Sequence, residues 1–214
     1  MDIPNEAPVM TLPNATLFPR ALLPLYIFEP RYRRMLEESL HSHRMLIVAM
    51  RKATATREIP CSIAGLGIIR VCVQNADGNS HLILEGMNRV ELGETVKLKP
   101  YRINHFRSLQ TPCKDSVTID ALMAKVRDLV SERIRQELPS KKAVSSTVSI
   151  KDVIASLERL NDPDRVADMV TWSLLPRAEQ RQSILETLEV EARLRRLIHF
   201  LMAEINQQRK TNIT

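Results

Sequence analysis

Hydrophobic residues in the first half of the chain come in short runs that are separated by glycine, proline and other turn-forming residues. All five glycines and nine of the twelve prolines lie before residue 113. Short runs rich in β-branched and aromatic residues between such breaks are typical of β-strands. The pattern predicts strands at 9–12, 22–28, 45–50, 63–73, 81–84, 89–92 and 102–106. Residues 75–79, Asn-Ala-Asp-Gly-Asn, predict a hairpin turn, because Asn, Asp and Gly tolerate positive φ angles.

One helix is expected inside this strand-rich half, at residues 30–41. Pro30 suits the first position of a helix, where its missing N–H has no intrahelical partner in any case. The apolar residues that follow it recur at the spacing of one helical face. A strand that ends near residue 28 therefore passes directly into a helix.

After residue 113 the hydrophobic period changes to that of α-helices. The segment 119–138 has one apolar face, which only Arg133 interrupts, and 140–147 is a polar loop. Further helices are predicted to begin near residues 149, 163 and 176, and 190–205 carries a continuous apolar stripe. We therefore predict a bundle of about five helices, with a β-rich domain at 1–113 and a helical domain at 114–214.

Composition limits the class of protein. The 214 residues are 44% hydrophobic and 26% charged, a balance typical of soluble folded domains. No apolar run approaches the roughly 18 residues of a transmembrane helix, and the first residues lack the basic and apolar regions of a secretory signal. We therefore expect a cytoplasmic protein without a membrane partner. The three cysteines fit neither a disulfide framework nor zinc-ligand spacing, so we expect reduced thiols.

Motifs for catalysis are missing from the sequence. No glycine is followed by lysine, as a phosphate-binding loop requires, and no Gly-x-Ser-x-Gly segment presents a serine nucleophile. His41 and His43 have no second pair of ligands at metal-binding spacing. We accordingly expect no enzymatic activity, no cofactor and no metal ion.

Three segments resemble those of a known protein family. The first extends from Leu17-Phe18-Pro19 to Met35 and includes Phe28-Glu29-Pro30-Arg31-Tyr32; the second extends from Gly65-Leu66-Gly67 to Val90, and the third from Leu174-Leu175-Pro176 to Leu194. In these segments the chain is similar to the N-terminal, substrate-recognition domain family of Lon-type proteases. The resemblance covers most of residues 9–206.

This resemblance implies an α+β fold in which a PUA-like β-barrel precedes an α-helical bundle. It implies a free-standing family member, without the ATPase and Ser/Lys protease domains of full-length Lon. The implied function is that of a non-catalytic protein-interaction module that binds exposed apolar segments of unfolded or client proteins. A separate ATP-dependent protease is the further partner that it suggests. The sequence does not determine the client or the oligomeric state.

The strand-to-helix corner is the predicted peptide-binding site, because several of the chain's few aromatic residues gather there. The candidate residues are Tyr26, Phe28, Arg31, Tyr32 and Met35. Aromatic, methionine and arginine side chains are enriched at protein contact surfaces. Strand alternation places Tyr26 and Phe28 on one face and Ile27 on the other, so one of these two sets belongs to the core.

A structural role for the same corner is the competing interpretation. Glu29 and Arg31 then pair with each other to hold the turn, while Phe28 and Tyr32 pack it.

RNA binding is the alternative function. The net charge is +6 at pH 7, and basic residues are frequent between residues 31 and 57. The PUA-like fold binds RNA in other families, although a fold does not fix a function. Only eight aromatic residues are available to stack on bases. Protein recognition is therefore the favoured interpretation.

Overall fold

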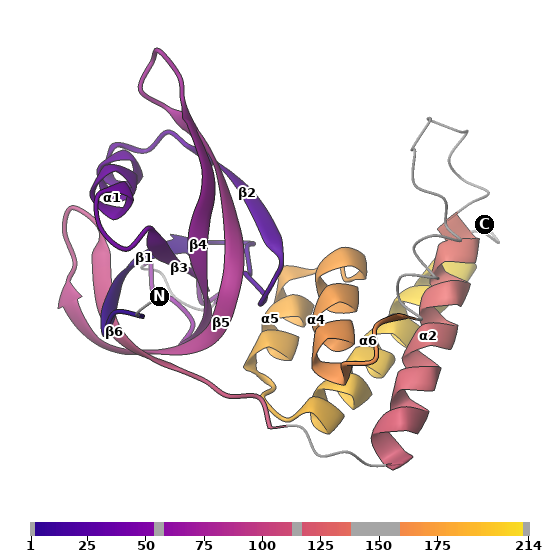
Figure 1. The fold of residues 1–214 in the computed structure, drawn as a ribbon. Helices are drawn as coiled ribbons and strands as arrows, with labels where there is room; N and C mark the ends of the chain where they lie inside the picture. The colour runs from indigo at the N-terminus through magenta and orange to yellow at the C-terminus, as the bar shows by residue number, and fades with distance from the viewer. Residues whose placement is uncertain (1–2, 54–57, 113–116, 138–158, 212–214) are drawn as a thin grey trace. The chain divides into compact units, whose positions relative to one another are not determined.

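The computed structural model describes residues 3–53, 58–112, 117–137 and 159–211 (Figure 1). These residues form six strands and five helices of an α+β protein. They group into two compact units, of which the first comprises Met1–Gln110 with Arg177–Glu186 and the second Thr111–Pro176 with Thr187–Thr214. The predicted domain boundary after residue 113 lies close to the end of Met1–Gln110, whereas no sequence pattern predicted that Arg177–Glu186 joins the first unit.

A single sheet dominates the first unit. Its strands are β1 (Glu6–Leu12), β2 (Leu22–Ile27), β3 (Met45–Met50), β4 (Ile63–Gln74), β5 (Ser80–Lys97) and β6 (Arg102–Ser108). They follow the order β2-β5-β4-β3-β1-β6, and β5 also pairs with β6. The β1–β3 pair is parallel and the other pairs are antiparallel. The predicted hairpin turn is confirmed, with Gly78 at φ +80° and its amide donating to Asn75 O at 3.0 Å.

The prediction of two separate strands at 81–84 and 89–92 was wrong, because both lie in the long strand β5. Gly86 suggested a break, yet it pairs within the ladder opposite Gly67 of β4. It is required there because the backbone of Phe18 passes directly over it. The glycine therefore marks a close crossing of the chain and not the end of a strand.

Helix α1 (Pro30–Leu40) packs its apolar face on the sheet, as the spacing predicted. Tyr32, Met35 and Leu36 are buried in one cluster with sheet residues such as Leu46 and Leu82. The run Met45–Met50 is buried at all six positions, because β3 is central and both of its faces are covered. A continuous apolar run is the sequence signature of such a strand.

Helix α5 (Ala178–Glu186) belongs to the first unit although it follows α4 in the chain. The Gln182 amide donates to Ile63 O at 2.9 Å, and Arg89 Nε donates to Leu185 O at 3.2 Å. Ala178 packs in a small buried cluster with Met50 and Cys61. Helical periodicity located this segment but carried no information about which unit it joins.

The second unit consists of helices α2 (Val117–Glu137), α4 (Pro163–Leu174) and α6 (Val190–Thr211). The predicted stripe of α6 is buried throughout, at Val190, Leu194, Leu197, Leu201 and Ile205. The predicted start of α4 is confirmed, since the Asp162 side chain accepts hydrogen bonds from the amides of Asp164 and Arg165. The loop predicted at 140–147 and nearly all of the helix predicted to follow it lie outside the described residues. Over the described ranges, no helix combines the length and apolarity that membrane crossing demands.

Candidate functional site

The end of strand β2 presents two aromatic side chains to solvent. Tyr26 is 47% exposed and Phe28 is 58% exposed, whereas Ile27 between them is 3% exposed. The two rings stack with their centroids 6.0 Å apart. Of the two sets distinguished by strand alternation, Ile27 is therefore the core residue, and the aromatic pair is available for contact.

Tyr32 and Met35, which the sequence analysis also proposed as binding residues, lie in the core. They are 5% and 0% exposed, because they are on the buried face of α1. The Tyr32 hydroxyl donates to Thr11 O at 3.2 Å. The two residues fix the helix against the sheet and have little surface to offer a partner.

Arg31 is held by two ion pairs. Its Nε lies 2.8 Å from Glu29 Oε2, and its Nη1 lies 2.7 Å from Glu58 Oε2. The Glu29–Arg31 contact is the pairing that the structural interpretation of this corner described, whereas Phe28 is exposed and does not pack it. Arg31 is partly exposed and adds a polar border beside the aromatic pair.

The aromatic pair continues into an apolar surface that crosses three strands. In the register of the sheet, Tyr26 lies opposite His81, which lies opposite Val73. One row further along, Pro24 lies opposite Ile83, which lies opposite Val71. We call the surface formed by Leu22, Pro24, Tyr26, Phe28, Val71, Val73 and Ile83 the apolar sheet face. Large exposed apolar patches usually mark interaction sites.

Val71, Val73 and Leu22 were not predicted as site residues, and they are 45%, 54% and 51% exposed. The signal was present in the alternation of Val71 and Val73 with polar and half-buried neighbours at the end of β4. The hairpin at 75–79 also sets which β5 residues these valines face. The position of β2 beside β5 is a non-local pairing that no local pattern contains.

Polar contacts fix the orientation of Tyr26. The Asn79 side-chain amide donates to the Tyr26 hydroxyl at 3.0 Å, and the His81 ring lies 4.9 Å from the Tyr26 ring. Asn79 is itself held by Asp77 of the hairpin turn. The ring is thus preorganised, and preorganisation of a side chain lowers the entropic cost of any contact it makes.

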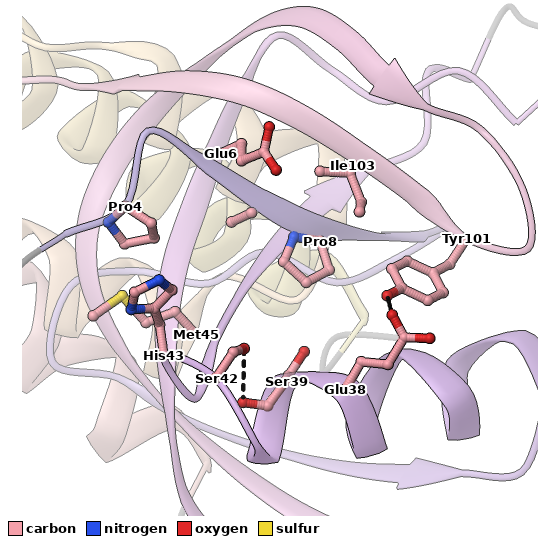
Figure 2. A pocket seen from close by; sticks show the side chains of 11 residues that line it. Pro4, Glu6, Pro8, Glu38, Ser39, Ser42, His43, Met45, Tyr101 and Ile103 are labelled. Atoms are coloured by element: carbon pink, nitrogen blue, oxygen red, sulfur yellow. Dashed lines mark hydrogen bonds between the residues drawn. The ribbon is translucent and has the colours of Figure 1, made fainter.

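A hollow of about 300 Å³ lies elsewhere on the first unit, beside α1 (Figure 2). Its walls include Pro4, Glu6, Pro8, His43, Met45 and Ile103. At one end the Tyr101 hydroxyl donates to the Glu38 carboxylate, and the Ser42 hydroxyl donates to Ser39 O at 3.3 Å. Several of its polar groups are already paired within the protein. Its volume is at the lower limit for small-molecule pockets, so we assign it no ligand.

Two tyrosines are expected to ionise late in an alkaline titration. Burial and nearby Glu58 raise the pKa of Tyr32 to about 12, and burial together with the hydrogen bond to Glu38 raises the pKa of Tyr101 to about 12. A raised pKa favours the neutral phenol in the folded state. The resulting stability is complete below pH 10 and is lost as the pH rises towards 12. Absorbance at 295 nm should show two late-ionising phenols in the folded protein, and Y32F and Y101F should each remove one.

The basic run considered for RNA binding is partly neutralised by acidic neighbours. Arg31 pairs with two glutamates, and Arg34 Nε lies 2.8 Å from Glu38 Oε1. The Tyr101 hydrogen bond and Arg34 lower the pKa of Glu38, which keeps this carboxylate charged. The RNA alternative therefore gains no support from this surface.

Comparison with known proteins identifies related sequences over nearly the whole chain. The family described as "ATP-dependent protease La (LON) substrate-binding domain" matches residues 6–203. The Lon protease of Dictyoglomus thermophilum is 21% identical over 207 residues, which are 95% of this chain and 25% of that protein. The Lon protease of Desulfovibrio desulfuricans is 29% identical over 191 residues, which are 86% of this chain and 21% of that protein. The chain thus spans about a quarter of the length of these relatives.

Two solved structures share the fold. The N-terminal domain of a Mycobacterium avium complex Lon protease superimposes with a TM-score of 0.73 at 19% identity and covers 92% of this chain and 98% of that one. A Lon N-terminal domain protein from Xanthomonas campestris gives a TM-score of 0.66 at 17% identity, with 91% and 98% covered. The observed combination of sheet and helices is therefore that of these domains.

Proposed function

The chain belongs to the family of Lon substrate-binding domains, and we propose that it recognises client proteins by binding their exposed apolar segments on the apolar sheet face. The family supports substrate recognition. The exposure and the apolar side chains of the sheet face support the proposal that apolar segments bind there. Unfolded proteins expose apolar side chains that folded proteins bury, so an exposed apolar surface discriminates between the two states.

The observation that carries the proposal is the exposed, stacked pair of Tyr26 and Phe28 beside the valines of β4. Aromatic side chains bury about 150–250 Å² each and dominate the energetics of interfaces. Arg31 stands beside the aromatic pair, and at the other end of this face Glu85 lies opposite Leu22 and pairs with Arg70. An apolar centre with a polar border is the usual anatomy of a protein-binding surface.

We further propose that the chain acts without catalysis of its own. The matched family is a substrate-binding domain, and a separate ATP-dependent protease is the natural recipient of a captured client. The cytoplasmic location expected from the sequence is part of the same proposal.

The sheet supports a PUA-like barrel as its finer architecture. Strand β5 pairs with β4 along one part of its length, and Val90–Lys97 of the same strand pairs with β6, which in turn pairs with β1. A ring of pairings β5-β4-β3-β1-β6-β5 follows from these contacts, with β2 outside it.

Replacement of both Tyr26 and Phe28 by alanine should weaken client binding by about 1–3 kcal/mol, or roughly 5- to 150-fold. Both side chains are exposed, so the melting temperature should change little. Fluorescence anisotropy with a labelled, reduced and carboxymethylated protein that cannot refold measures the affinity.

The matched control replaces Val96 and Leu98, which are also exposed but lie near the other end of β5. The V96A/L98A variant should bind as the unmodified protein does. Equal affinities of the Y26A/F28A variant and the control would contradict the proposed surface.

A further inference from the structure

Strand β2 has an open hydrogen-bonding edge. Among the described strands, β1, β3, β4, β5 and β6 each pair with at least two others, whereas β2 stands at the end of the order and pairs with β5 alone. No described strand occupies its other side. An open edge presents a row of unpaired N–H and C=O groups that can template a further strand.

The register shows which residues of β2 direct their backbone groups to this edge. Pro24 has no N–H, so the Pro24–Ile83 pair cannot exchange two hydrogen bonds and is a non-hydrogen-bonded pair. On β5, the Gly86 amide donates to Ala21 O at 2.9 Å, which shows that even-numbered residues of β5 face β2. Both observations give the same alternation. Leu22, Pro24 and Tyr26 direct their backbone groups outward, and Leu23, Leu25 and Ile27 bond to β5.

The open edge offers three carbonyl acceptors, on Leu22, Pro24 and Tyr26, and two amide donors, on Leu22 and Tyr26. The same residues place their side chains on the apolar sheet face. A strand added at this edge would lie beside β2 and widen that face. Its alternate side chains would continue the rows Tyr26–His81–Val73 and Pro24–Ile83–Val71.

Charged residues do not protect this edge, because the β2 sequence Leu-Leu-Pro-Leu-Tyr-Ile contains none. Natural edge strands are usually shielded by lysines, prolines, inward-pointing charges or bulges, and Pro24 is the one such residue in β2. Pro24 removes one donor and leaves the donors of Leu22 and Tyr26 on either side of it. An uncharged edge of this kind suits an extended, apolar peptide segment.

We propose that β2 receives an extended segment of an unfolded client as an additional strand of the sheet. This inference rests on the proposed function and specifies its mode of recognition. Main-chain hydrogen bonds to the open edge hold the segment, and every second client side chain contacts the apolar sheet face. Recognition by the main chain would allow the edge to accept many client sequences, because every peptide carries the same backbone groups.

An N-methyl scan of a client peptide tests this mode. The probe is a ten-residue capped peptide in which valine and threonine alternate, together with the variants that carry one N-methyl group at each position in turn. N-methylation removes one backbone donor and obstructs one edge. In an added strand only alternate amides face β2, so N-methylation should weaken binding at least tenfold at every second position across the paired segment and less than twofold between them.

A protein variant supplies the complementary measurement. Y26A removes the ring and keeps the outward amide, whereas Y26P removes both. Y26P should bind the unmethylated peptide at least threefold more weakly than Y26A, with the fold checked by circular dichroism. If Y26P does not fold, the alternation in the N-methyl scan decides the question alone.

The outcomes separate the inference from the function on which it rests. Binding of the peptide with no alternation along the scan would overturn strand addition and leave client recognition intact. Binding of neither the peptide nor the carboxymethylated protein would overturn the proposed function. A homodimer in analytical ultracentrifugation that Y26P dissociates would also overturn the inference, because a second copy would then occupy the edge.

Discussion

Replacement of Arg193 by methionine is expected to destabilise the second unit by about 3–5 kcal/mol. Arg193 lies on α6 and is 0% exposed. Its Nη1 pairs with Asp164 and lies 3.3 Å from Asp168 Oδ1. Methionine fills a similar volume but leaves Asp168, which is also buried, without this positive partner. Removal of one charge from a buried ion-pair network is among the most destabilising changes a single substitution can make.

The guanidinium of Arg193 also holds the chain that precedes α6. Its Nε donates to Thr187 O at 2.8 Å, and its Nη2 donates to Leu188 O at 2.9 Å. Loss of the side chain removes these two donors as well as the ion pairs. Backbone carbonyls that lose a buried partner add to the cost.

Trp172 provides the measurement, because it is the single tryptophan of the chain and lies on α4 of the same unit. Urea unfolding followed by its fluorescence should show a lower midpoint for R193M. The control is R195M: Arg195 is two residues away on α6, exposed, and paired with Glu191 at 2.7 Å. This variant should lose less than about 1 kcal/mol. The double variant R193M/D168N should recover part of the loss, and equal effects of R193M and R195M would refute the argument.

Local sequence patterns predicted the positions of the helices and strands more completely than the contacts between them. The position of β3, the start of α4 and the stripe of α6 follow from spacing, capping and apolar periodicity, because the residues that cause these elements are neighbours in sequence. The membership of α5 in the first unit depends on contacts such as Gln182 with Ile63, which are 119 residues apart. No local pattern encodes such a contact.

Local patterns likewise predicted only part of the candidate site. Alternation separated Ile27 from Tyr26 and Phe28, but it did not determine which set was buried. Tyr32 and Met35 have the side-chain chemistry of contact residues, although the helical spacing that predicted α1 also places them on its apolar face. That periodicity is the sequence signal that assigns them to the core. Val71 and Val73 join Tyr26 only through the register of three strands, which requires the assembled sheet.

Gly65 and Gly86 of the second resembling segment have a physical explanation in the crossing of two parts of the chain. The segment Leu17-Phe18 passes over β4 and β5, where Leu17 is buried among core residues. A Cβ atom at Gly65 would lie 2.0 Å from Leu17 O, and one at Gly86 would lie 1.9 Å from Phe18 O. Glycine at positions 65 and 86 is therefore matched to the crossing, since side chains there would push the Leu17-Phe18 segment off the sheet.

Substitution of Gly86 by alanine should therefore destabilise the first unit by about 3 kcal/mol or more, at or beyond the upper end of the usual range for overpacked cores. Gly86 does not have a positive φ, so alanine suits its backbone, and the cause of the loss is the collision with the Leu17-Phe18 segment, above all with Phe18 O. The clashing atom is a backbone oxygen, which cannot rotate away as a side chain can. Thermal unfolding followed by far-ultraviolet circular dichroism, with hydrogen exchange of the β5 amides, measures the effect.

Gly93 is the matched control for this prediction, because it lies on the same strand and its Cβ would meet nothing closer than His105 O at 3.4 Å. G93A should keep the melting temperature nearly unchanged, and the lower backbone entropy of the unfolded chain favours a slight rise. The G86A variant should in contrast lose exchange protection along β5 where Phe18 crosses it. If G86A and G93A were equally stable, the crossing of Leu17-Phe18 would not be the reason that glycine occupies position 86.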